Sequence, residues 1–335
     1  MAIAPTPKGT IMRDGCAQLY RFRRAKADAL APGAMPLLLV PSMINKWYVL
    51  DLRRGASLAA ALTGAGLDTF CLDWGTPEDE DRYVTWDDVI ARLHRAIRRV
   101  KRETGAPRVG LLGYCMGATL AGIATALRPD DVGALVNLAG PFDFAHAGFL
   151  GAMVAREHFD VEAMIQAGNI TPLQMQSGFV ALRPTAQLSK CVALFDRGQD
   201  PAFRDAFDTL EGWATDNVPF PAAAYGTYIR ELYQENLLMA GEHYVAGQRV
   251  ELRRITCPVL TVTADRDSIC PVAAARGLHD RCGSADRELL VVPGGHVGAV
   301  VGSKAPAVLY PAIAKWLVER LSRSRKEASA EAACN

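Results

Sequence analysis

The sequence lacks the features that mark a secreted or membrane-spanning protein. Residues 1–10 lack the apolar core of a secretion signal, and the purely apolar runs elsewhere are too short for a membrane-spanning helix. Eight cysteines follow neither a zinc-binding spacing nor a paired disulfide framework. Unpatterned thiols of this kind are typical of a reducing cytosol, where one of them can serve as a nucleophile.

The sequence also lacks an excess of charge of one sign. Lys and Arg number 37 against 36 Asp and Glu, which gives a formal net charge of +1. Nucleic-acid phosphates call for a basic surface, so no nucleic-acid partner is expected. Half of the 335 residues are hydrophobic, enough to bury the core of one large domain or of a domain carrying an insertion.

Strand-like and helix-like segments alternate along the chain. Short apolar runs predict buried strands at residues 35–41, 67–74, 108–114, 132–140, 258–264 and 289–293. Longer segments predict helices at residues 52–64, 86–103, 117–127 and 306–321. This alternation indicates an α/β fold with a mostly parallel central sheet and helices on both faces.

Residues 141–250 differ from the rest, because they hold little strand pattern, many aromatic and methionine residues, and helix-like stretches such as 223–239. We interpret them as a helical cap inserted between two halves of the core, residues 1–140 and 251–321. Their methionines and aromatics are expected to form the core of the cap rather than a cofactor site. The polar, alanine-rich tail at 322–335 is expected to be disordered.

The motif GYCMG at residues 113–117 lies where a predicted strand turns into a predicted helix, which is the setting of a nucleophile elbow. Such an elbow holds its middle residue, here Cys115, in a strained backbone geometry. Glycines on either side avoid collisions in the tight turn. The positive end of the following helix favours a thiolate. The alternative is a buried structural cysteine between two incidental glycines.

Candidate partners for Cys115 follow in the order acid, then histidine, that this elbow requires. Asp267 lies just past the predicted strand at 258–264; Asp265 competes for the role, but Asp267 sits deeper in the loop. His296 lies among glycines directly after the last predicted strand. The other histidines are expected to be surface or packing residues: His94 on a polar helix face, His146, His158 and His243 in the cap, and His279 in a helix.

An oxyanion hole requires two backbone N–H groups near the nucleophile. We expect one from Met116, which follows the nucleophile, and the other from Met43 or Ile44, which follow the predicted strand at 35–41. These are backbone roles, so the side-chain types carry little information.

Beyond these residues the sequence resembles the polyhydroxyalkanoate (PHA) synthases, most closely the short, PhaC-like catalytic subunits of class III. The matching segments are PSMINKWYVLDL at 41–52, LDWGTPEDEDRYVTWDD at 72–88, GLLGYCMGATL at 110–120, YIRELYQENLL at 228–238, ADRDSICP at 264–271 and PGGHVG at 293–298. They follow in order from about residue 35 to 320, so the resemblance covers nearly the whole chain. The short N-terminus is also similar to class III, because class I and II enzymes carry a long extra N-terminal domain.

The resemblance implies an α/β-hydrolase fold and an acyltransferase that polymerises (R)-3-hydroxyacyl-CoA into polyester, releasing CoA through a cysteine thioester. The family's triad falls on Cys115, Asp267 and His296, the residues reached above. No cofactor is expected, since the CoA thioester is the substrate. A PhaE-like second subunit, a homo-oligomer and a cytoplasmic place at the surface of polyester granules are further expectations.

Two positions depart from the family pattern. Ala118 stands where the family usually has a second glycine, and Ser268 stands where it often has a histidine. Neither change removes a catalytic group, but Ser268 leaves out a polar ring beside the site. Two other functions stay open: a cysteine hydrolase on the same fold (a thioesterase or an intracellular PHA depolymerase), and a non-catalytic granule-surface protein.

Overall fold

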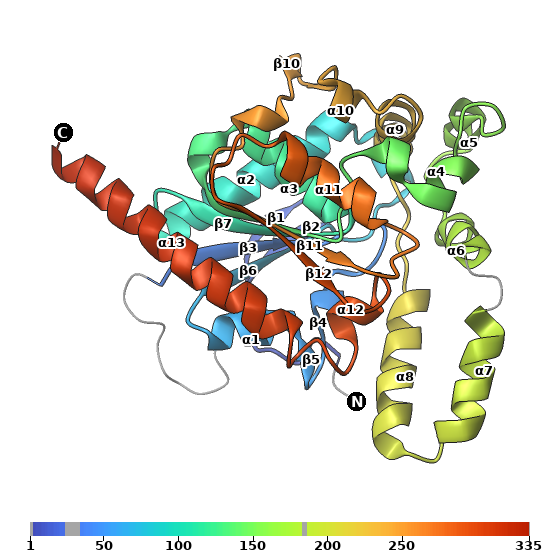
Figure 1. Ribbon diagram of the computed structural model, residues 1–335. Helices are drawn as coiled ribbons and strands as arrows, with labels where there is room; N and C mark the ends of the chain where they lie inside the picture. Colours follow the sequence, from blue (N-terminus) through green and yellow to red (C-terminus); the bar gives the residue numbers. More distant parts are fainter. Residues whose placement is uncertain (1–2, 24–33, 183–185, 335) are drawn as a thin grey trace.

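One large β-sheet forms the centre of the protein. Figure 1 shows the computed structural model, which describes residues 3–23, 34–182 and 186–334. Within these ranges eight strands form the sheet, in the order β1-β2-β6-β3-β7-β8-β11-β12. They are β1 Lys8–Asp14, β2 Ala17–Phe22, β3 Pro36–Val40, β6 Asp68–Asp73, β7 Val109–Tyr114, β8 Val132–Leu138, β11 Val259–Ala264 and β12 Arg287–Val292. Neighbouring strands from β6 through β3, β7, β8 and β11 to β12 pair in parallel, and β1 and β2 are antiparallel, which confirms the predicted mostly parallel sheet.

Helices cover both faces of the sheet, as predicted. Figure 1 shows α2, α3 and α11 on one face and α1 and α13 on the other. Their bounds are α1 Leu58–Gly64, α2 Trp86–Thr104, α3 Met116–Leu127, α11 Val272–Arg281 and α13 Leu309–Cys334. Successive strand residues point to opposite faces, so Leu38 packs in the core beneath α2 and α3, and Leu37 and Leu39 pack beneath α1 and α13. The unbroken apolar run of β3 is therefore the pattern of a strand covered on both sides.

Helix α2 begins where the sequence predicts. The Thr85 hydroxyl accepts the Asp88 N–H at 3.2 Å, and the Asp88 carboxylate accepts the Thr85 N–H at 2.9 Å, which completes a capping box. The expectation for His94 is wrong, because its ring is buried rather than on a polar face. Its Nε2 lies 3.1 Å from the carbonyl oxygen of Ala124, since α3 packs across this side of α2.

The hairpin of β1 and β2 is not predicted by the sequence analysis. Its two turn residues are Gly15 and Cys16, and Gly15 has a φ of 61°, in the left-handed region that glycine adopts readily. Glycine at the first of two turn residues is typical of one class of tight hairpin turn. The strands are only partly buried, so their apolar pattern is weak.

The prediction of one helix over residues 52–64 is wrong in its first half. Two short strands, β4 (Asp51–Arg53) and β5 (Ala56–Ser57), precede α1 and pair with each other. Gly55, with a φ of 78°, makes the turn between them. Helix α1 then begins after Ser57, whose hydroxyl accepts the Ala60 N–H at 2.9 Å.

Between β8 and β11 the chain leaves the sheet and forms a mainly helical insertion, which occupies one side of the molecule in Figure 1. Its elements are α4 Gly148–Met153, α5 Val161–Gln166, α6 Pro172–Ala181, α7 Ala186–Arg197, α8 Pro201–Thr215, α9 Ala222–Thr227, the π-helix η5 Tyr228–Gln234, α10 Leu237–Ala240, β9 Tyr244–Val245 and β10 Gln248–Arg249. The helix-like stretch at 223–239 is thus a composite of α9, η5 and α10. The exact limits of the two core halves and the cap stay predictions.

The expected disordered tail at 322–335 is not what the structure contains. Helix α13 continues without a break to Cys334, and residue 335 lies outside the described residues. The segment is rich in Ala, Glu, Arg and Lys, which have high intrinsic helix propensity. Across the described ranges, every helix is too short or too polar to span a membrane.

Candidate active site

Cys115 occupies the sharp turn between β7 and α3. Its φ of 56° and ψ of −132° lie outside the regions that a residue with a side chain readily adopts. Two backbone bonds fix the turn: the Cys115 N–H donates to the Leu138 carbonyl at 2.9 Å, and the Ala118 N–H donates to the Cys115 carbonyl at 2.9 Å. A strained residue held this firmly, with a partly exposed side chain, is the geometry expected of a nucleophile elbow.

The two glycines of the motif are required by close backbone approach. A Cβ atom on Gly113 would lie 2.2 Å from the Cα of Ala118. A Cβ atom on Gly117 would lie 2.0 Å from the carbonyl oxygen of Val40. Neither obstacle is a flexible side chain, so only glycine fits at either position. This argues against the interpretation of an incidental pair of glycines around a structural cysteine.

Asp267 and His296 form a buried hydrogen-bonded pair. Oδ2 of Asp267 lies 2.7 Å from Nδ1 of His296. Oδ1 of Asp267 accepts the N–H groups of Ile269 and Cys270, both at 2.8 Å. The carboxylate can only accept, so Nδ1 of His296 carries the hydrogen and its Nε2 is left for the nucleophile.

The charge of Cys115 affects the pKa of His296. Burial disfavours the imidazolium, but the negative charge of the Cys115 sulfur and the hydrogen bond to Asp267 outweigh it and raise the pKa of His296 to about 10. Nε2 is buried and makes no well-formed hydrogen bond within the described ranges, although it interacts with the Cys115 sulfur. Catalytic hydrogen bonds are often long before substrate binds, so the structure brings the imidazole and thiol together at interaction distance rather than in a tight bond.

Asp265, the competing acid, has a different task. It is exposed, and its Oδ1 accepts the Gly294 N–H at 2.7 Å. This bond lowers the pKa of Asp265 and ties its loop to the loop of His296. Asp265 therefore supports the backbone, and Asp267 alone of the two contacts the imidazole of His296.

The His296 ring rests on an aromatic neighbour that the sequence analysis does not single out. Tyr114, the residue before Cys115, stacks on it with ring centroids 5.4 Å apart and planes 27° apart. Burial, with the nearby charges of Cys115 and Asp267, raises the pKa of Tyr114 well above its ordinary range. Tyr114 thus stays a neutral phenol whose ring limits how His296 can tilt.

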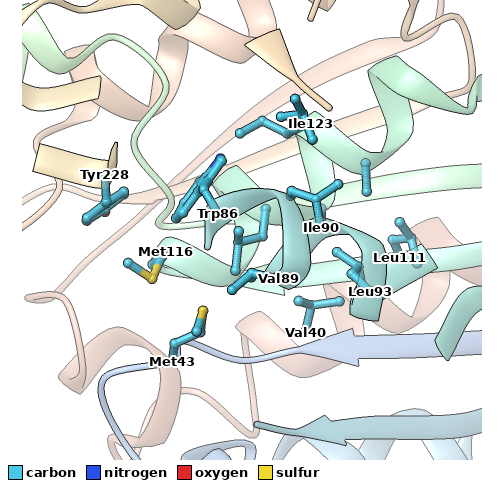
Figure 2. Close-up of a cluster of buried hydrophobic side chains, with 14 of the residues drawn as sticks. Val40, Met43, Trp86, Val89, Ile90, Leu93, Leu111, Met116, Ile123 and Tyr228 are labelled. Carbon is cyan, nitrogen blue, oxygen red and sulfur yellow. The ribbon is translucent and has the colours of Figure 1, made fainter. Parts of the chain in front are cut away.

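Of the two expected oxyanion donors, Met116 follows Cys115 directly in the sequence, and Met43 lies in the loop after β3. Met116 is the first residue of α3, so its N–H has no acceptor one turn earlier in the helix. In Figure 2 the buried side chains of Met116 and Met43 lie next to each other. The N–H of Ile44, the alternative, already donates to the Ser42 hydroxyl at 3.2 Å. This favours Met43 over Ile44, and the oxyanion roles of Met43 and Met116 stay predictions.

A cavity of about 190 Å³ lies between Cys115 and the cap, and its lining is mostly apolar. Core residues of the lining include Ile44, Ile269 and Cys270, and cap residues include Phe159, Met164, Phe179, Tyr228 and Tyr233. An acyl chain or polyester segment is the kind of ligand that such a surface accommodates. In the described ranges no group of His, Cys, Asp and Glu side chains is arranged to hold a metal ion.

Tyr228 and Tyr233 bring two phenol groups to this apolar cavity, and the sequence analysis assigns neither of them a role in the site. Their rings are 5.3 Å apart and nearly perpendicular. Burial and the charge of Cys115 raise the pKa of each above its ordinary range, so both remain hydrogen-bond donors. The signal was present in the segment YIRELYQENLL, but only the π-helix places both rings beside Cys115.

The two departures from the family pattern are both accommodated. Ala118 is fully buried and its N–H completes the turn at Cys115. Ser268 follows Asp267 and interacts with its surroundings. Of the remaining histidines, His146 and His158 are exposed and His279 is partly buried.

Two family descriptions match the chain. Residues 36–303 match the "alpha/beta hydrolase fold" family, and residues 1–61 match the "Poly-beta-hydroxybutyrate polymerase (PhaC) N-terminus". The first covers most of the chain and includes the positions of Cys115, Asp267 and His296.

Curated relatives match over nearly the whole chain. The poly(3-hydroxyalkanoate) polymerase subunit PhaC of Allochromatium vinosum is 34% identical over 320 residues, covering 94% of this chain and 89% of the relative. The protein of the same name from a Synechocystis species is 32% identical over 325 residues, covering 94% and 85%. Among solved structures, a hydrolase from Pseudomonas aeruginosa has a TM-score of 0.57 at 15% identity, covering 92% of this chain and 98% of its own, a likeness of fold alone.

Proposed function

Because this chain belongs to the poly(3-hydroxyalkanoate) polymerase (PhaC) family, an acyltransferase family on the α/β-hydrolase fold, we propose that it polymerises (R)-3-hydroxyacyl-CoA through a thioester on Cys115. One observation carries the mechanism: the strained elbow holds Cys115 next to a buried His296 and Asp267 pair and beside an apolar cavity. Such an arrangement suits transfer of an acyl group with water kept out.

Acylation of Cys115 is the first step. The Cys115 thiolate attacks the thioester carbonyl of the substrate, and the carbonyl oxygen takes the negative charge, facing the N–H groups of Met116 and Met43. The carbon–sulfur bond to CoA then breaks, and the departing thiolate takes the proton held by His296. One thioester replaces another, so the step is nearly balanced in energy and the acyl group stays activated.

Ester formation is the second step. Neutral His296, oriented by Asp267, takes the proton of a 3-hydroxyl group while the hydroxyl oxygen attacks an acyl thioester carbonyl. A carbon–oxygen bond forms, the carbon–sulfur bond breaks, and the leaving thiolate is stabilised by the imidazolium that results. Tyr228 and Tyr233 are suited to donate a hydrogen bond to the substrate beside the reacting carbonyl.

Exclusion of water separates a polymerase from a hydrolase on the same framework. The mostly apolar lining supports the polymerase, because water has few hydrogen-bonding partners there. A thioesterase or intracellular depolymerase is not favoured, since the relatives that cover most of the chain are polymerases. An intact nucleophile, base and acid likewise argue against a non-catalytic granule-surface protein.

The test is incubation of the purified chain with (R)-3-hydroxybutyryl-CoA, following CoA release and product together. Polymer formed in step with CoA release supports the proposal. CoA release with only free 3-hydroxybutyrate would identify a hydrolase instead. Shorter and longer 3-hydroxyacyl-CoA substrates, compared by kcat/KM, then define the acyl length that the cavity accepts.

Partners and location follow from the same proposal. The relatives are named as subunits, which supports a PhaE-like second chain, and we propose a homo-oligomer acting in the cytoplasm at the surface of polyester granules. No cofactor is needed, since the CoA thioester supplies the activated acyl group. Addition of a PhaE-like protein is expected to shorten any lag in CoA release.

A further inference from the structure

Three side chains, two of them buried and the third partly exposed, form a line of hydrogen bonds between the core and the cap. The indole Nε1–H of Trp86, on α2, donates to Nε2 of His243 at 3.1 Å. Nδ1 of the same imidazole lies 2.8 Å from Oε2 of Glu231, on the π-helix η5. The His243 side chain is completely buried. A polar ring buried this deeply with both nitrogens bonded has a specific structural role.

The partners of His243 determine where its hydrogen resides. An indole N–H can only donate, so Nε2 of His243 must accept and carries no hydrogen. Nδ1 therefore carries the hydrogen and donates it to the Glu231 carboxylate. An added proton on Nε2 would set two donors against each other across the 3.1 Å contact with Trp86. Hydrogen-bond donation thus runs in one direction, from Trp86 to His243 and from His243 to Glu231.

These hydrogen bonds end on the helix that lines the active-site cavity. Glu231 lies between Tyr228 and Tyr233 in the sequence of η5, and those two tyrosines, unlike Glu231, line the cavity with Cys115. The Trp86 ring also stacks on the Tyr228 ring, with centroids 5.5 Å apart and planes 21° apart (Figure 2). Trp86 therefore holds η5 in two ways: directly by stacking, and through His243 by hydrogen bonds.

A π-helix depends on such contacts, because its hydrogen-bond pattern is rare and occurs mainly where surrounding structure imposes it. The far end of η5 has its own ties. The Gln234 amide donates to the carbonyls of Val154 and Phe159 at 3.0 and 3.2 Å. The Tyr228 and Tyr233 rings also pack edge-on against Phe144, with centroids 5.9 and 4.8 Å apart. The bond from His243 to Glu231 adds a directional contact to the middle turn of η5.

We propose that His243 is a positioning residue for the polymerase reaction: in its Nδ1–H form it fixes the turn of η5 that presents Tyr228 and Tyr233 to the acyl group on Cys115. This inference rests on the proposed function for its meaning, although the geometry it predicts can be probed without turnover. Loss of the hydrogen bonds through His243 is expected to impair the placement of substrate and to leave Cys115 itself unchanged.

The experiment compares His243→Leu with His243→Gln and with the matched control His94→Leu. His243→Leu removes both bonds at similar volume, whereas a glutamine offers a carbonyl to Trp86 and an amide N–H to Glu231. His94 is also buried and bonded, to Ala124 on α3, but does not line the cavity. We expect His243→Leu to raise KM for (R)-3-hydroxybutyryl-CoA by about ten-fold or more, with a smaller loss of kcat. We expect His243→Gln to have a KM and kcat close to those of the wild type.

A second readout does not depend on polymerase activity. Alkylation of Cys115 by iodoacetamide reports the thiol, and alkylation by the bulkier, apolar N-phenylmaleimide also reports the cavity. His243→Leu is expected to change the ratio of the two rates several-fold, and His94→Leu to leave it unchanged. Absence of polymer in the wild type would reject the proposed function, while this ratio would still test His243.

Two results would overturn the inference. One is a folded His243→Leu protein with wild-type KM and a wild-type alkylation ratio. The other is an equal change in His94→Leu, which would mean general loosening of the core. If His243→Leu does not fold, Trp86→Phe takes its place, because it removes the indole N–H and keeps a ring to stack on Tyr228; an unchanged KM and ratio there contradict the inference equally.

Discussion

Nδ1 of His296 lies 2.7 Å from Oδ2 of Asp267, and the other oxygen of that carboxylate is held by two N–H groups of its own loop. The carboxylate cannot rotate without losing those bonds, so the direction of the imidazole is fixed by the backbone after β11. Two residues earlier, Asp265 uses its carboxylate to hold Gly294 instead. Neighbouring acids in one loop thus have separable roles.

The different roles of Asp267 and Asp265 can be tested with the same substitution at each position. Asp267→Asn is expected to lower kcat for CoA release by about 10²–10⁴-fold, because an amide no longer fixes the Nδ1–H form of His296 or stabilises its charge. Asp265→Asn, the matched control, should stay within about ten-fold of wild type, since it only weakens a loop contact. Steady-state CoA release measures both. A larger loss in Asp265→Asn than in Asp267→Asn would reverse the assignment.

Replacement of Cys115 tests the nucleophile. Cys115→Ala is expected to abolish CoA release, and Cys115→Ser to lower it by about 10³-fold or more, because an alcohol is a poor nucleophile near neutral pH. Trapping of the acyl-enzyme, followed by mass spectrometry, should find the added acyl group on the peptide containing Cys115. Cys282→Ala, at a buried thiol outside the cavity, is the control. Substantial turnover in Cys115→Ala would show that another group carries the acyl chain.

The raised pKa of His296 predicts a pH dependence of stability. Its folded-state pKa is about 10, above the ordinary 6.5, so the folded protein binds this proton more tightly than the unfolded chain. The stabilisation is complete below about pH 6.5 and is lost as pH rises toward 10. Urea unfolding should therefore show a wild-type advantage over His296→Gln at pH 6 that shrinks by pH 9.5. A stability difference between wild type and His296→Gln that does not vary with pH would mean that the neighbours of His296 do not favour its protonated form.

Much of the core was predictable because its elements are buried on fixed sides. Strand β3 is covered on both faces, so its sequence had to be an apolar run, and the elbow had to place glycines where backbone atoms approach to about 2 Å. Cys115, Asp267 and His296 each follow a strand at the same edge of the sheet, which is why their order in the chain was informative.

The features that the sequence did not predict depend on contacts with residues from distant segments. His94 and His243 are polar residues that become buried only because Ala124 and Trp86 supply a hydrogen-bond partner, and no local pattern encodes that pairing. The π-helix η5 has the periodicity of an ordinary helix in sequence, and tertiary contacts decide its form. Backbone roles such as those of Met43 and Met116 are independent of side-chain type.

The elbow glycines predict a sharp difference between two substitutions. In Gly117→Ala the new Cβ meets the Val40 carbonyl oxygen at 2.0 Å, so β3 and α3 must separate. We expect a loss of about 1–3 kcal/mol or more in unfolding free energy, together with lost activity. Gly212→Ala, in α8, meets nothing within 4 Å and should stabilise by about 0.5–1 kcal/mol. Thermal denaturation compares the two, and equal stability of both variants would contradict the packing described here.

Motion of the cap is the remaining prediction, and it follows from the size of the cavity. A space of about 190 Å³ is small beside the roughly 300–1,000 Å³ typical of small-ligand sites, whereas the substrate is a bulky CoA thioester and the product a growing polymer. The helices over the cavity must therefore separate from the core and close again to exclude water. Helix α6 lines the cavity through Gln174, Met175 and Phe179 but is not buried at any of its positions, so it can move at low cost. Hydrogen exchange with and without a substrate analogue should show weak protection of residues 172–181 that increases on binding, against constant protection of α3. Equal, strong protection of residues 141–250 in both states would mean a fixed insertion that only enlarges the core, and would leave the assignment of Cys115, Asp267 and His296 as it stands.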